Sequence, residues 1–390
     1  MRKLATAILI LLVPLSASSF ERNAMRFDRL SIDDGLAQSS VMAIRQDHAG
    51  FMWFATENGL DRYDGITFRN YRNQQGRDHS LADNFSRDLD IGADGSLWVA
   101  TDGGGVSRWM PRTDQFVSWK HDPTDPASLA SDRIRTILVD PRGFVWIGTR
   151  DAGLDRLDPA SGQVTHYAHS ADESASLSNN EIYALALDTD GALWIGTKAG
   201  LNRLEPESGR ITRYLSDPDN PASLAGDDVR SLLVDQQGTL WIGTSNGGLS
   251  RFDAASKSFS HFRHRADDYR SISSDRIQVI FEDDEQRIWV GTNTGLNLLN
   301  RVTGEFLNYR NDPTDAHSLS SDDIFSVFQD RGGVLWIGTR NNGINKWNPR
   351  SWSFGHFKPS SSPDRAAGNP KVMSFTEDSS GRLWVATFGG

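Results

Sequence analysis

The chain of 390 residues contains no cysteine, so its folding does not depend on whether its compartment is oxidising or reducing. Positive charge is also scarce, because 41 Lys and Arg residues face 51 Asp and Glu residues and the formal net charge is −10. Proteins that hold nucleic acid through its phosphates need a basic surface, and no basic stripe occurs in this sequence. We therefore expect no nucleic-acid partner.

Long apolar runs are missing except near the N-terminus. There, Arg2 and Lys3 precede the apolar residues 4–15, and the small residues 16–19 follow. This order predicts a signal peptide at residues 1–19 and a periplasmic location after export. The apolar run is shorter than the roughly 20 residues of a membrane span, although an uncleaved anchor stays an alternative.

One repeated phrase dominates the rest of the chain. It consists of an apolar residue, a tryptophan, a second apolar residue, a glycine or alanine, and a threonine. The eight copies are centred on Trp53, Trp98, Trp146, Trp194, Trp241, Trp289, Trp336 and Trp384. Successive tryptophans are 45 to 48 residues apart. This period is typical of a propeller or a solenoid, in which each unit buries its apolar faces against its neighbours.

The repeat at residues 134–181 illustrates the internal order of one unit. Four short runs rich in β-branched and aromatic residues alternate with turns rich in Asp, Pro and Gly. The predicted strands are residues 134–140, 144–149, 153–157 and 163–168. Four antiparallel strands in a unit of this length are typical of a propeller blade. We therefore expect an all-β fold, a β-propeller of four-stranded antiparallel blades.

Two other features of the repeat are interpreted as structural. Aspartate lies six residues before the tryptophan in seven of the eight repeats, and Gly92 replaces it in the second. This pattern is turn chemistry. The Asp188–Gly191 segment lacks the later ligands of a calcium loop, so we expect no metal there. The large tryptophan rings are expected to fill the gaps between adjacent blades, and the small residue after each one to let a neighbouring backbone approach.

The number of repeats predicts seven blades and half of another. Residues 25–358 are expected to form one seven-bladed propeller, closed by a strand around residues 26–30 that pairs into the last blade. Residues 359–390 begin an eighth repeat, which is expected to be the first blade of a second propeller. Ending after its second strand would leave an unpaired edge, so the chain is expected to be part of a longer protein. A single eight-bladed ring is the less favoured alternative.

The candidate ligand-binding residues lie on one face. If strands are numbered 1 to 4 from the centre outwards, the 2–3 and 4–1 loops share a face, and these loops vary most in chemistry. Binding concentrates on variable loops that a rigid scaffold holds. A mixture of Arg, Asn, Asp and aromatic residues suits a polar ligand such as a sugar or an anionic glycan. The candidates are Arg87, Asp102, Arg135, Arg150, Tyr183, Lys198, Arg230, Asn246, Asn293, Arg340 and Asn341.

Residues 188–203 contain Asp188, Trp194 and Arg203 in the pattern Asp-x-x-Gly-x-Leu-Trp-Ile-Gly-Thr-x-x-Gly-Leu-x-Arg. Over residues 26–390 the chain resembles the two-component regulator propeller repeat family. The resemblance implies the extracytoplasmic sensor of a bacterial signalling protein, with a transmembrane helix and a histidine kinase or diguanylate cyclase further along. It also implies a small polar ligand such as an oligosaccharide, and a second propeller or protomer as partner.

The sequence contains no kinase phosphoacceptor region, Gly-Gly-Asp-Glu-Phe motif or nucleotide loop. We therefore expect no catalytic residue, cofactor or metal in this chain. One alternative is a secreted propeller enzyme similar to streptogramin lyases, which needs a histidine and a metal near the channel. Only His79 and His317 are placed on the binding face, half a ring apart, which does not make a metal site. Another alternative is an adhesion or scaffold propeller.

Overall fold

A computed structural model describes residues 25–349, 372–378 and 383–387. The chain divides into two compact units, residues 1–348 and residues 349–390, which are described separately. The predicted signal peptide at residues 1–19 and the predicted boundary at residues 358–359 lie outside the described residues. Within those residues the one helical element is the 3-10 turn η1 (Ile32–Asp34), and no helix there is long and apolar enough to cross a membrane.

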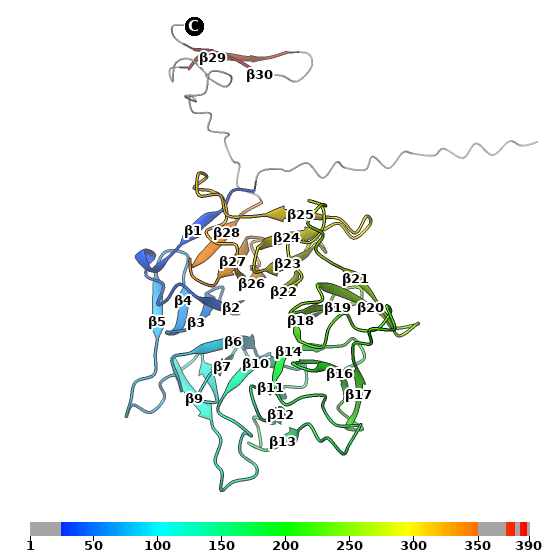
Figure 1. The fold of residues 1–390 in the computed structure, drawn as a ribbon. Coiled ribbons are helices and arrows are strands. Elements are labelled where there is room, and N and C mark those ends of the chain that lie inside the picture. Colours follow the sequence, from blue (N-terminus) through cyan, green and yellow to red (C-terminus); the bar gives the residue numbers. More distant parts are fainter. Residues whose placement is uncertain (1–24, 350–371, 379–382, 388–390) are drawn as a thin grey trace, which may run out of the picture. The chain divides into compact units, whose positions relative to one another are not determined.

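The first unit consists of seven four-stranded antiparallel sheets, which Figure 1 shows arranged in a ring. Blades 1 and 2 contain β2 (Val41–Gln46), β3 (Met52–Thr56), β4 (Gly59–Tyr63), β5 (Phe68–Tyr71), β6 (Ser86–Ile91), β7 (Leu97–Thr101), β8 (Val106–Met110) and β9 (Gln115–Trp119). Blades 3 and 4 contain β10 (Ile134–Val139), β11 (Val145–Thr149), β12 (Leu154–Leu157), β13 (Val164–Tyr167), β14 (Ile182–Leu187), β15 (Leu193–Thr197), β16 (Gly200–Glu205) and β17 (Arg210–Tyr214).

The remaining blades continue this order. Blades 5 and 6 contain β18 (Val229–Val234), β19 (Leu240–Thr244), β20 (Leu249–Asp253), β21 (Ser258–Phe262), β22 (Ile277–Glu282), β23 (Ile288–Thr292), β24 (Gly295–Leu299) and β25 (Phe306–Tyr309). Blade 7 contains β26 (Ile324–Gln329), β27 (Leu335–Thr339), β28 (Ile344–Trp347) and β1 (Asp28–Leu30). The predicted seven-bladed propeller is confirmed, and the four strands predicted for residues 134–181 are β10 to β13.

The ring is closed by the first strand of the chain, as the sequence predicts. Strand β1 pairs antiparallel with β28, with Asp28 opposite Lys346 and Leu30 opposite Ile344. The amide of Phe27 also donates to the carbonyl of His317 at 2.8 Å. The last blade therefore combines three strands that are late in the sequence, β26 to β28, with an outer strand that is early in it, β1.

The apolar core lies between the blades. All five residues of the second strand are buried in every blade. Trp53 of blade 1 packs with Leu97 and Val99 of blade 2, and its ring centroid is 4.7 Å from that of Trp109. The predicted gap-filling role of the tryptophans is confirmed, and it gives each pair of neighbouring blades its own apolar cluster.

In blades 3 to 7 the glycine two residues after the tryptophan makes room for the next blade. A Cβ added at Gly148 would lie 2.7 Å from Cγ2 of Ile182, the first residue of the next inner strand. At Gly338 the neighbour includes the carbonyl oxygen of Val41, at 2.8 Å. The predicted close approach is therefore present, but it involves a β-branched side chain at Gly148 rather than the backbone alone.

The recurrent aspartate has a second role beyond its turn. Its carboxylate accepts a hydrogen bond from the indole Nε1 of the tryptophan six residues later, at 2.7 to 3.3 Å. The pairs are Asp47–Trp53, Asp140–Trp146, Asp188–Trp194, Asp235–Trp241, Asp283–Trp289 and Asp330–Trp336. A buried indole N–H needs such a partner. The aspartate therefore joins the 1–2 turn to the core in six of the seven blades, a contact that turn statistics do not predict.

The second unit contains a two-stranded antiparallel sheet, β29 (Val372–Glu377) and β30 (Leu383–Thr387). Val372 lies opposite Thr387, and the pairing shifts between Val372 and Ser374. The inner two strands of every blade in the ring have this same register, for example Ile134 opposite Thr149. The hairpin thus has the pairing of the first half of a blade.

Candidate functional site

Each inner strand of the ring begins with a β-bulge at its second residue, where the pairing with the next strand shifts. A bulge re-aims the side chain of the extra residue. The strand starts lie on the face of the 2–3 and 4–1 loops, and the bulge residues are half-buried there. These residues are Met42, Arg87, Arg135, Tyr183, Arg230, Gln278 and Phe325. Together with the 2–3 loops and the residues just before each inner strand, they are called the rim below.

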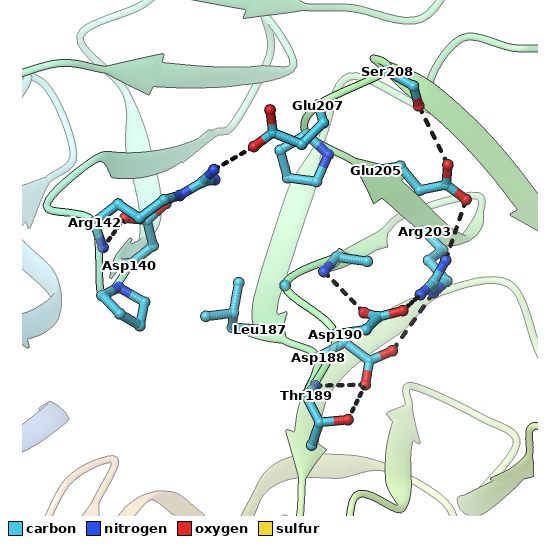
Figure 2. A pocket seen from close by; sticks show the side chains of 14 residues that line it. Asp140, Arg142, Leu187, Asp188, Thr189, Asp190, Arg203, Glu205, Glu207 and Ser208 are labelled. Carbon is cyan, nitrogen blue, oxygen red and sulfur yellow. Dashed lines mark hydrogen bonds and ion pairs between the residues drawn. The ribbon is translucent and has the colours of Figure 1, made fainter.

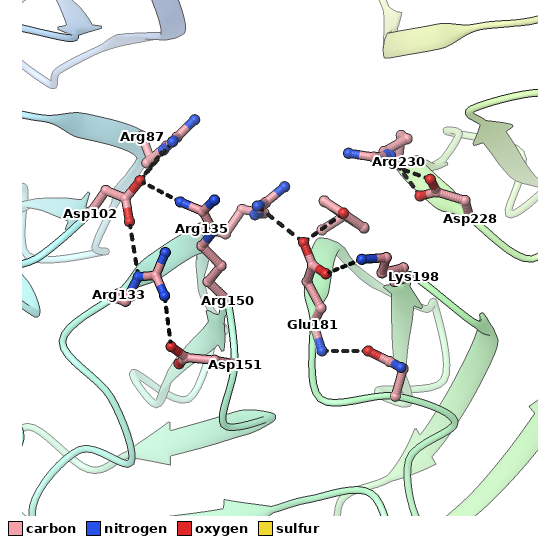
Figure 3. Close-up of polar contacts among 12 residues, drawn as sticks. Arg87, Asp102, Arg133, Arg135, Arg150, Asp151, Glu181, Lys198, Asp228 and Arg230 are labelled. Atoms are coloured by element: carbon pink, nitrogen blue, oxygen red, sulfur yellow. Dashed lines mark hydrogen bonds and ion pairs between the residues drawn. The ribbon is translucent and has the colours of Figure 1, made fainter.

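On blades 2 and 3 the rim gathers three arginines around one carboxylate (Figure 3). Asp102, in the 2–3 loop of blade 2, accepts from Arg87 at 2.6 Å and from Arg150 at 3.3 Å. Arg133 approaches the other carboxylate oxygen of Asp102 to 3.8 Å and donates to Asp151 at 3.2 Å. Only 9% of the Asp102 side chain is exposed. One nearly buried carboxylate therefore holds guanidinium groups from two blades together.

On blades 3 to 5 the rim is organised around Tyr183. The guanidinium carbons of Arg135 and Arg230, from the two neighbouring blades, lie 4.3 and 3.8 Å from the centroid of its ring. The Tyr183 hydroxyl donates to Glu181 at 2.7 Å. Burial, together with that hydrogen bond, raises the pKa of Tyr183 to about 12. The tyrosine therefore stays protonated and provides a fixed surface for two cations.

Glu181 connects the tyrosine to further positive groups. It accepts from Arg135 at 3.3 Å and from Lys198 at 3.1 Å (Figure 3). Burial alone would raise the pKa of Glu181, but the hydrogen bonds from Tyr183 and Lys198 and the charge of Arg135 lower it below its usual value. Burial lowers the pKa of Arg135. Glu181 is therefore ionised at neutral pH and partly neutralises the cations beside it.

These contacts form one charged set, which we call the cationic arc. Its positive members are Arg87, Arg133, Arg135, Arg150, Lys198 and Arg230. Its carboxylates are Asp102, Asp151, Glu181 and Asp228, the last paired with Arg230 at 2.6 Å. Six positive charges against four negative ones leave an excess of two, in a chain whose net charge is −10. The arc is thus a local reversal of the protein's overall charge.

Seven of the sequence-predicted residues belong to the cationic arc or line it: Arg87, Asp102, Arg135, Arg150, Tyr183, Lys198 and Arg230. The other four lie on 2–3 loops further round the rim. Asn293 accepts from Ser274 at 2.8 Å, and Arg340 lies 3.6 Å from Asp323. Asn246 and Asn341 are exposed. The bulge positions on blades 6, 7 and 1 are Gln278, Phe325 and Met42, so the bulge residues of this part of the rim are uncharged.

Four members of the arc, Arg133, Asp151, Glu181 and Asp228, are not among the sequence-predicted candidates. Asp151 lies in a 2–3 loop, and the other three lie just before an inner strand, two residues ahead of the bulge. The carbonyls of Arg133 and Glu181 accept the amides of Arg150 and Lys198, the first residues of the 2–3 loops, at 2.8 and 3.0 Å. The sequence signal was a charged residue that recurs directly before an inner strand. This signal points to the rim only when the bulge and the contact with the 2–3 loop are known.

The opposite face carries a pocket of about 560 Å³ between blades 3 and 4 (Figure 2). Its carboxylates are engaged with arginines: Glu207 accepts from Arg142 at 2.5 Å, and Arg203 pairs with Asp188 and Asp190. The segment that superficially resembles a calcium loop is therefore held by Arg203 and by Trp194 in this structure. In the part of the chain that the structure describes, no group of three or more His, Asp or Glu side chains could hold a metal ion.

The structure corrects the expectation that only His79 and His317 lie in 4–1 loops. His121, His169 and His264 also lie there, because β9, β13 and β21 end before them. The Nδ1 atoms of these three lie 2.6, 2.7 and 2.8 Å from the carbonyl oxygens of Leu129, Leu177 and Ile272. They hold the loops to their own backbone, which is a structural role.

The repeats match a known family model, described as two component regulator propeller. The matches are residues 35–58, 128–151, 176–199, 223–246, 271–294, 318–341 and 367–389. The first six begin shortly before an inner strand and end in the 2–3 loop, so they cover the segment that builds the rim. The repeats are those of the two component regulator propeller family.

Solved structures show a related arrangement. The extracellular domain of a hybrid two component system from B. thetaiotaomicron is 28% identical, with a TM-score of 0.79, over 94% of this chain and 47% of that one. Virginiamycin B lyase from Staphylococcus aureus has a TM-score of 0.60 at 15% identity, over 83% of this chain and 98% of the lyase. At that identity the lyase shares the fold alone.

A curated relative matches over a shorter segment. Histidine kinase P4 from Formosa agariphila is 55% identical over 40 residues, which are 10% of this chain and 3% of the kinase. The matched part of this chain thus spans about half of the B. thetaiotaomicron domain and a small part of the kinase. Two component regulator propeller repeats therefore occur here in a chain that is similar to extracellular parts of two-component systems.

Proposed function

We propose that this chain is the extracytoplasmic ligand-sensing module of a membrane-bound bacterial signalling protein. The likeness to the extracellular domain of a hybrid two component system supports this proposal, as does the match to histidine kinase P4. Residues 1–19 would direct export to the periplasm. The output would be a histidine kinase or a diguanylate cyclase, joined through segments beyond this sequence.

The ligand that fits best is an acidic oligosaccharide, and the cationic arc is the observation that carries this choice. Guanidinium groups match carboxylates and sulfates in geometry, and their hydrogen bonds to anions are stronger than neutral ones. The arc has an excess of positive charge, and Arg135 and Arg230 lie against a tyrosine that fixes their position. In a protein that is acidic overall, the positive cationic arc attracts an anion to this part of the rim.

Signalling would begin with a change of ion pairs. Asp102 and Glu181 already occupy the cations of the arc, so an anionic ligand competes with these internal carboxylates. The cations that leave them come from blades 2 to 4, and Arg150 and Lys198 lie in 2–3 loops of the rim. We propose that the rearranged loops alter the packing against a second propeller or protomer.

The decisive experiment measures binding of tetragalacturonate by calorimetry, with uncharged maltotetraose for comparison. Wild-type protein should bind the acidic oligosaccharide more tightly. The double variant Arg135→Ala/Arg230→Ala should weaken that binding by about 100-fold, since each charge-assisted contact contributes roughly 1.5–3 kcal/mol. The control variant Arg112→Ala/Arg142→Ala removes the same charge from turns of the opposite face and should bind within about twofold of wild type.

The control separates local contacts from overall charge. If both double variants bind tetragalacturonate equally weakly, the loss of affinity follows from the change in net charge, and the arc is not the binding site. If wild-type protein binds tetragalacturonate no more tightly than Arg135→Ala/Arg230→Ala does, the acidic ligand is wrong.

A further inference from the structure

A second polar surface lies on the outer part of blades 5 and 6, outside the cationic arc. A groove of about 1150 Å³ is bounded by the 4–1 loop at residues 264–273, by β25, and by residues 310–312 after that strand. We call it the Tyr269 groove. No member of the cationic arc lines it, so the two surfaces can be tested separately.

Tyr269 distinguishes this loop from the other 4–1 loops of the ring. The position two residues before the recurrent loop serine holds Asp78, Pro126, Ser174, Pro221 or Ala316 in the other loops, and it is aromatic only here. The Tyr269 side chain is 79% exposed. An exposed tyrosine presents a flat apolar face with a polar tip. Among the six 4–1 loops that carry this serine, only this one therefore has an aromatic residue at that position.

The tyrosine is held in place although it is exposed. The Nε atom of Arg270 donates to the Tyr269 hydroxyl at 3.1 Å, and Nη1 of Arg270 donates to Glu305 at 3.0 Å. The side-chain amide of Asn308, on β25, donates to the carbonyls of Tyr269 and Ser271 at 3.0 and 3.1 Å. Both the ring and the backbone beneath it are thus fixed before any ligand arrives, which lowers the entropic cost of binding.

The charged side chains that line the groove are three arginines and four carboxylates, and its hydrogen-bonding groups are not fully satisfied. Arg265 pairs with Asp268, and Arg270 pairs with Glu305. The lining also contains Arg310, Asp267 and Asp312, so no excess of positive charge attracts an anion. The Oδ1 atom of Asn308 is buried and has no hydrogen-bond partner among the described residues. A buried acceptor of this kind calls for a donor.

We propose that the Tyr269 groove binds an uncharged oligosaccharide. The C–H face of a pyranose ring packs on a flat aromatic ring, and its hydroxyl groups both donate and accept, so they match amide, guanidinium and carboxylate groups. An apolar ligand would leave these polar groups unpaired. This site is separate from the acidic-ligand site of the cationic arc and does not depend on it.

The experiment uses the full chain and neutral hexasaccharides of glucose, xylose and mannose as probes, with binding measured by calorimetry. At least one of them should bind, and Tyr269→Ala should weaken that binding about tenfold or more. Tyr269→Phe keeps the flat ring and should stay within about threefold of wild type. Val302→Ala removes another exposed apolar side chain of blade 6, outside the groove, and should change nothing.

Three outcomes overturn the proposal. The first is that none of the probes binds. The second is that Tyr269→Ala binds as wild type does. The third is that neutral sugars lose affinity in Arg135→Ala/Arg230→Ala and not in Tyr269→Ala, which assigns them to the cationic arc. Because no member of the cationic arc lines the Tyr269 groove, failure here leaves the acidic-ligand test unaffected.

Discussion

On the face of the 1–2 turns, six of the seven blades repeat the same aspartate–tryptophan hydrogen bond. On the opposite face, the seven bulge positions hold five different residue types. Every inner strand has the same bulge, so the backbone at these positions is alike in all seven blades. The aspartate accepts a hydrogen bond from a buried indole of its own blade, whereas the bulge side chain lies half-buried at the rim and differs from blade to blade. The difference separates residues that build the ring from residues available for binding.

The largest effect should come from removing one aspartate of the repeated face. Asp283 is buried and accepts from the indole of Trp289 at 2.7 Å and from Arg287 at 2.6 Å. Asp283→Ala leaves both donors without their acceptor and should lower the free energy of unfolding by about 3 kcal/mol. Urea unfolding measures this. Asp284→Ala, at the exposed neighbour, should stay within about 0.5 kcal/mol; equal losses in the two variants would contradict the structural role.

A second change should stabilise the protein. Asp61 on β4 accepts the amide of Ala37 at 3.0 Å, whereas Asn202 and Asn297 accept the corresponding amides in blades 4 and 6. Burial raises the pKa of Asp61 to about 6 from 3.8. A raised carboxyl pKa means that the folded state binds the proton more tightly, so the ionised group costs stability as the pH rises above about 4, and the full cost is reached above pH 6.

Asp61→Asn removes that cost while keeping the acceptor. At pH 8 the variant should be more stable than wild type by up to about 3 kcal/mol, and the advantage should vanish near pH 4. Urea unfolding at pH 4, 6 and 8 tests this. An advantage that stays constant across the three pH values would show that proton binding at Asp61 is not its cause.

The smallest effect should come from the rim. Glu181→Gln keeps an acceptor for the Tyr183 hydroxyl but removes a negative charge from the cationic arc. Stability should change by less than about 1 kcal/mol, and tetragalacturonate should bind about threefold more tightly and with a steeper dependence on salt. Calorimetry at two salt concentrations measures both. Weaker binding would mean that Glu181 contributes mainly by positioning Lys198 and Arg135.

The fold was predictable because its determinants are local and repeated. Strand runs, turn residues and the tryptophan phrase recur with one period, and even the closing strand near Asp28 could be placed once seven blades were counted. Part of the site was predictable for the same reason, since Arg135 and Tyr183 occupy the same place in consecutive repeats. The bulge that orients them leaves no mark in the residue pattern.

Contacts between blades were not predictable from the repeat. Asp102 meets Arg133 and Arg150, which are 31 and 48 positions away, because the curvature of the ring brings the start of one blade beside the loop of the one before it. Glu181 and Asp228 pass for ordinary charged loop residues in the sequence. Their role depends on which neighbour they reach, and this is a property of the closed ring rather than of one repeat.

The closing strand also has a mechanical consequence. In the pair of β1 and β28, Asp28 lies opposite Lys346, so the chain enters β1 and leaves β28 at the same end of the two strands. Tension applied between these two chain segments would load the hydrogen bonds one after another from that end, rather than all three residue pairs together. A pull along the chain would therefore open blade 7 at the pair of β1 and β28.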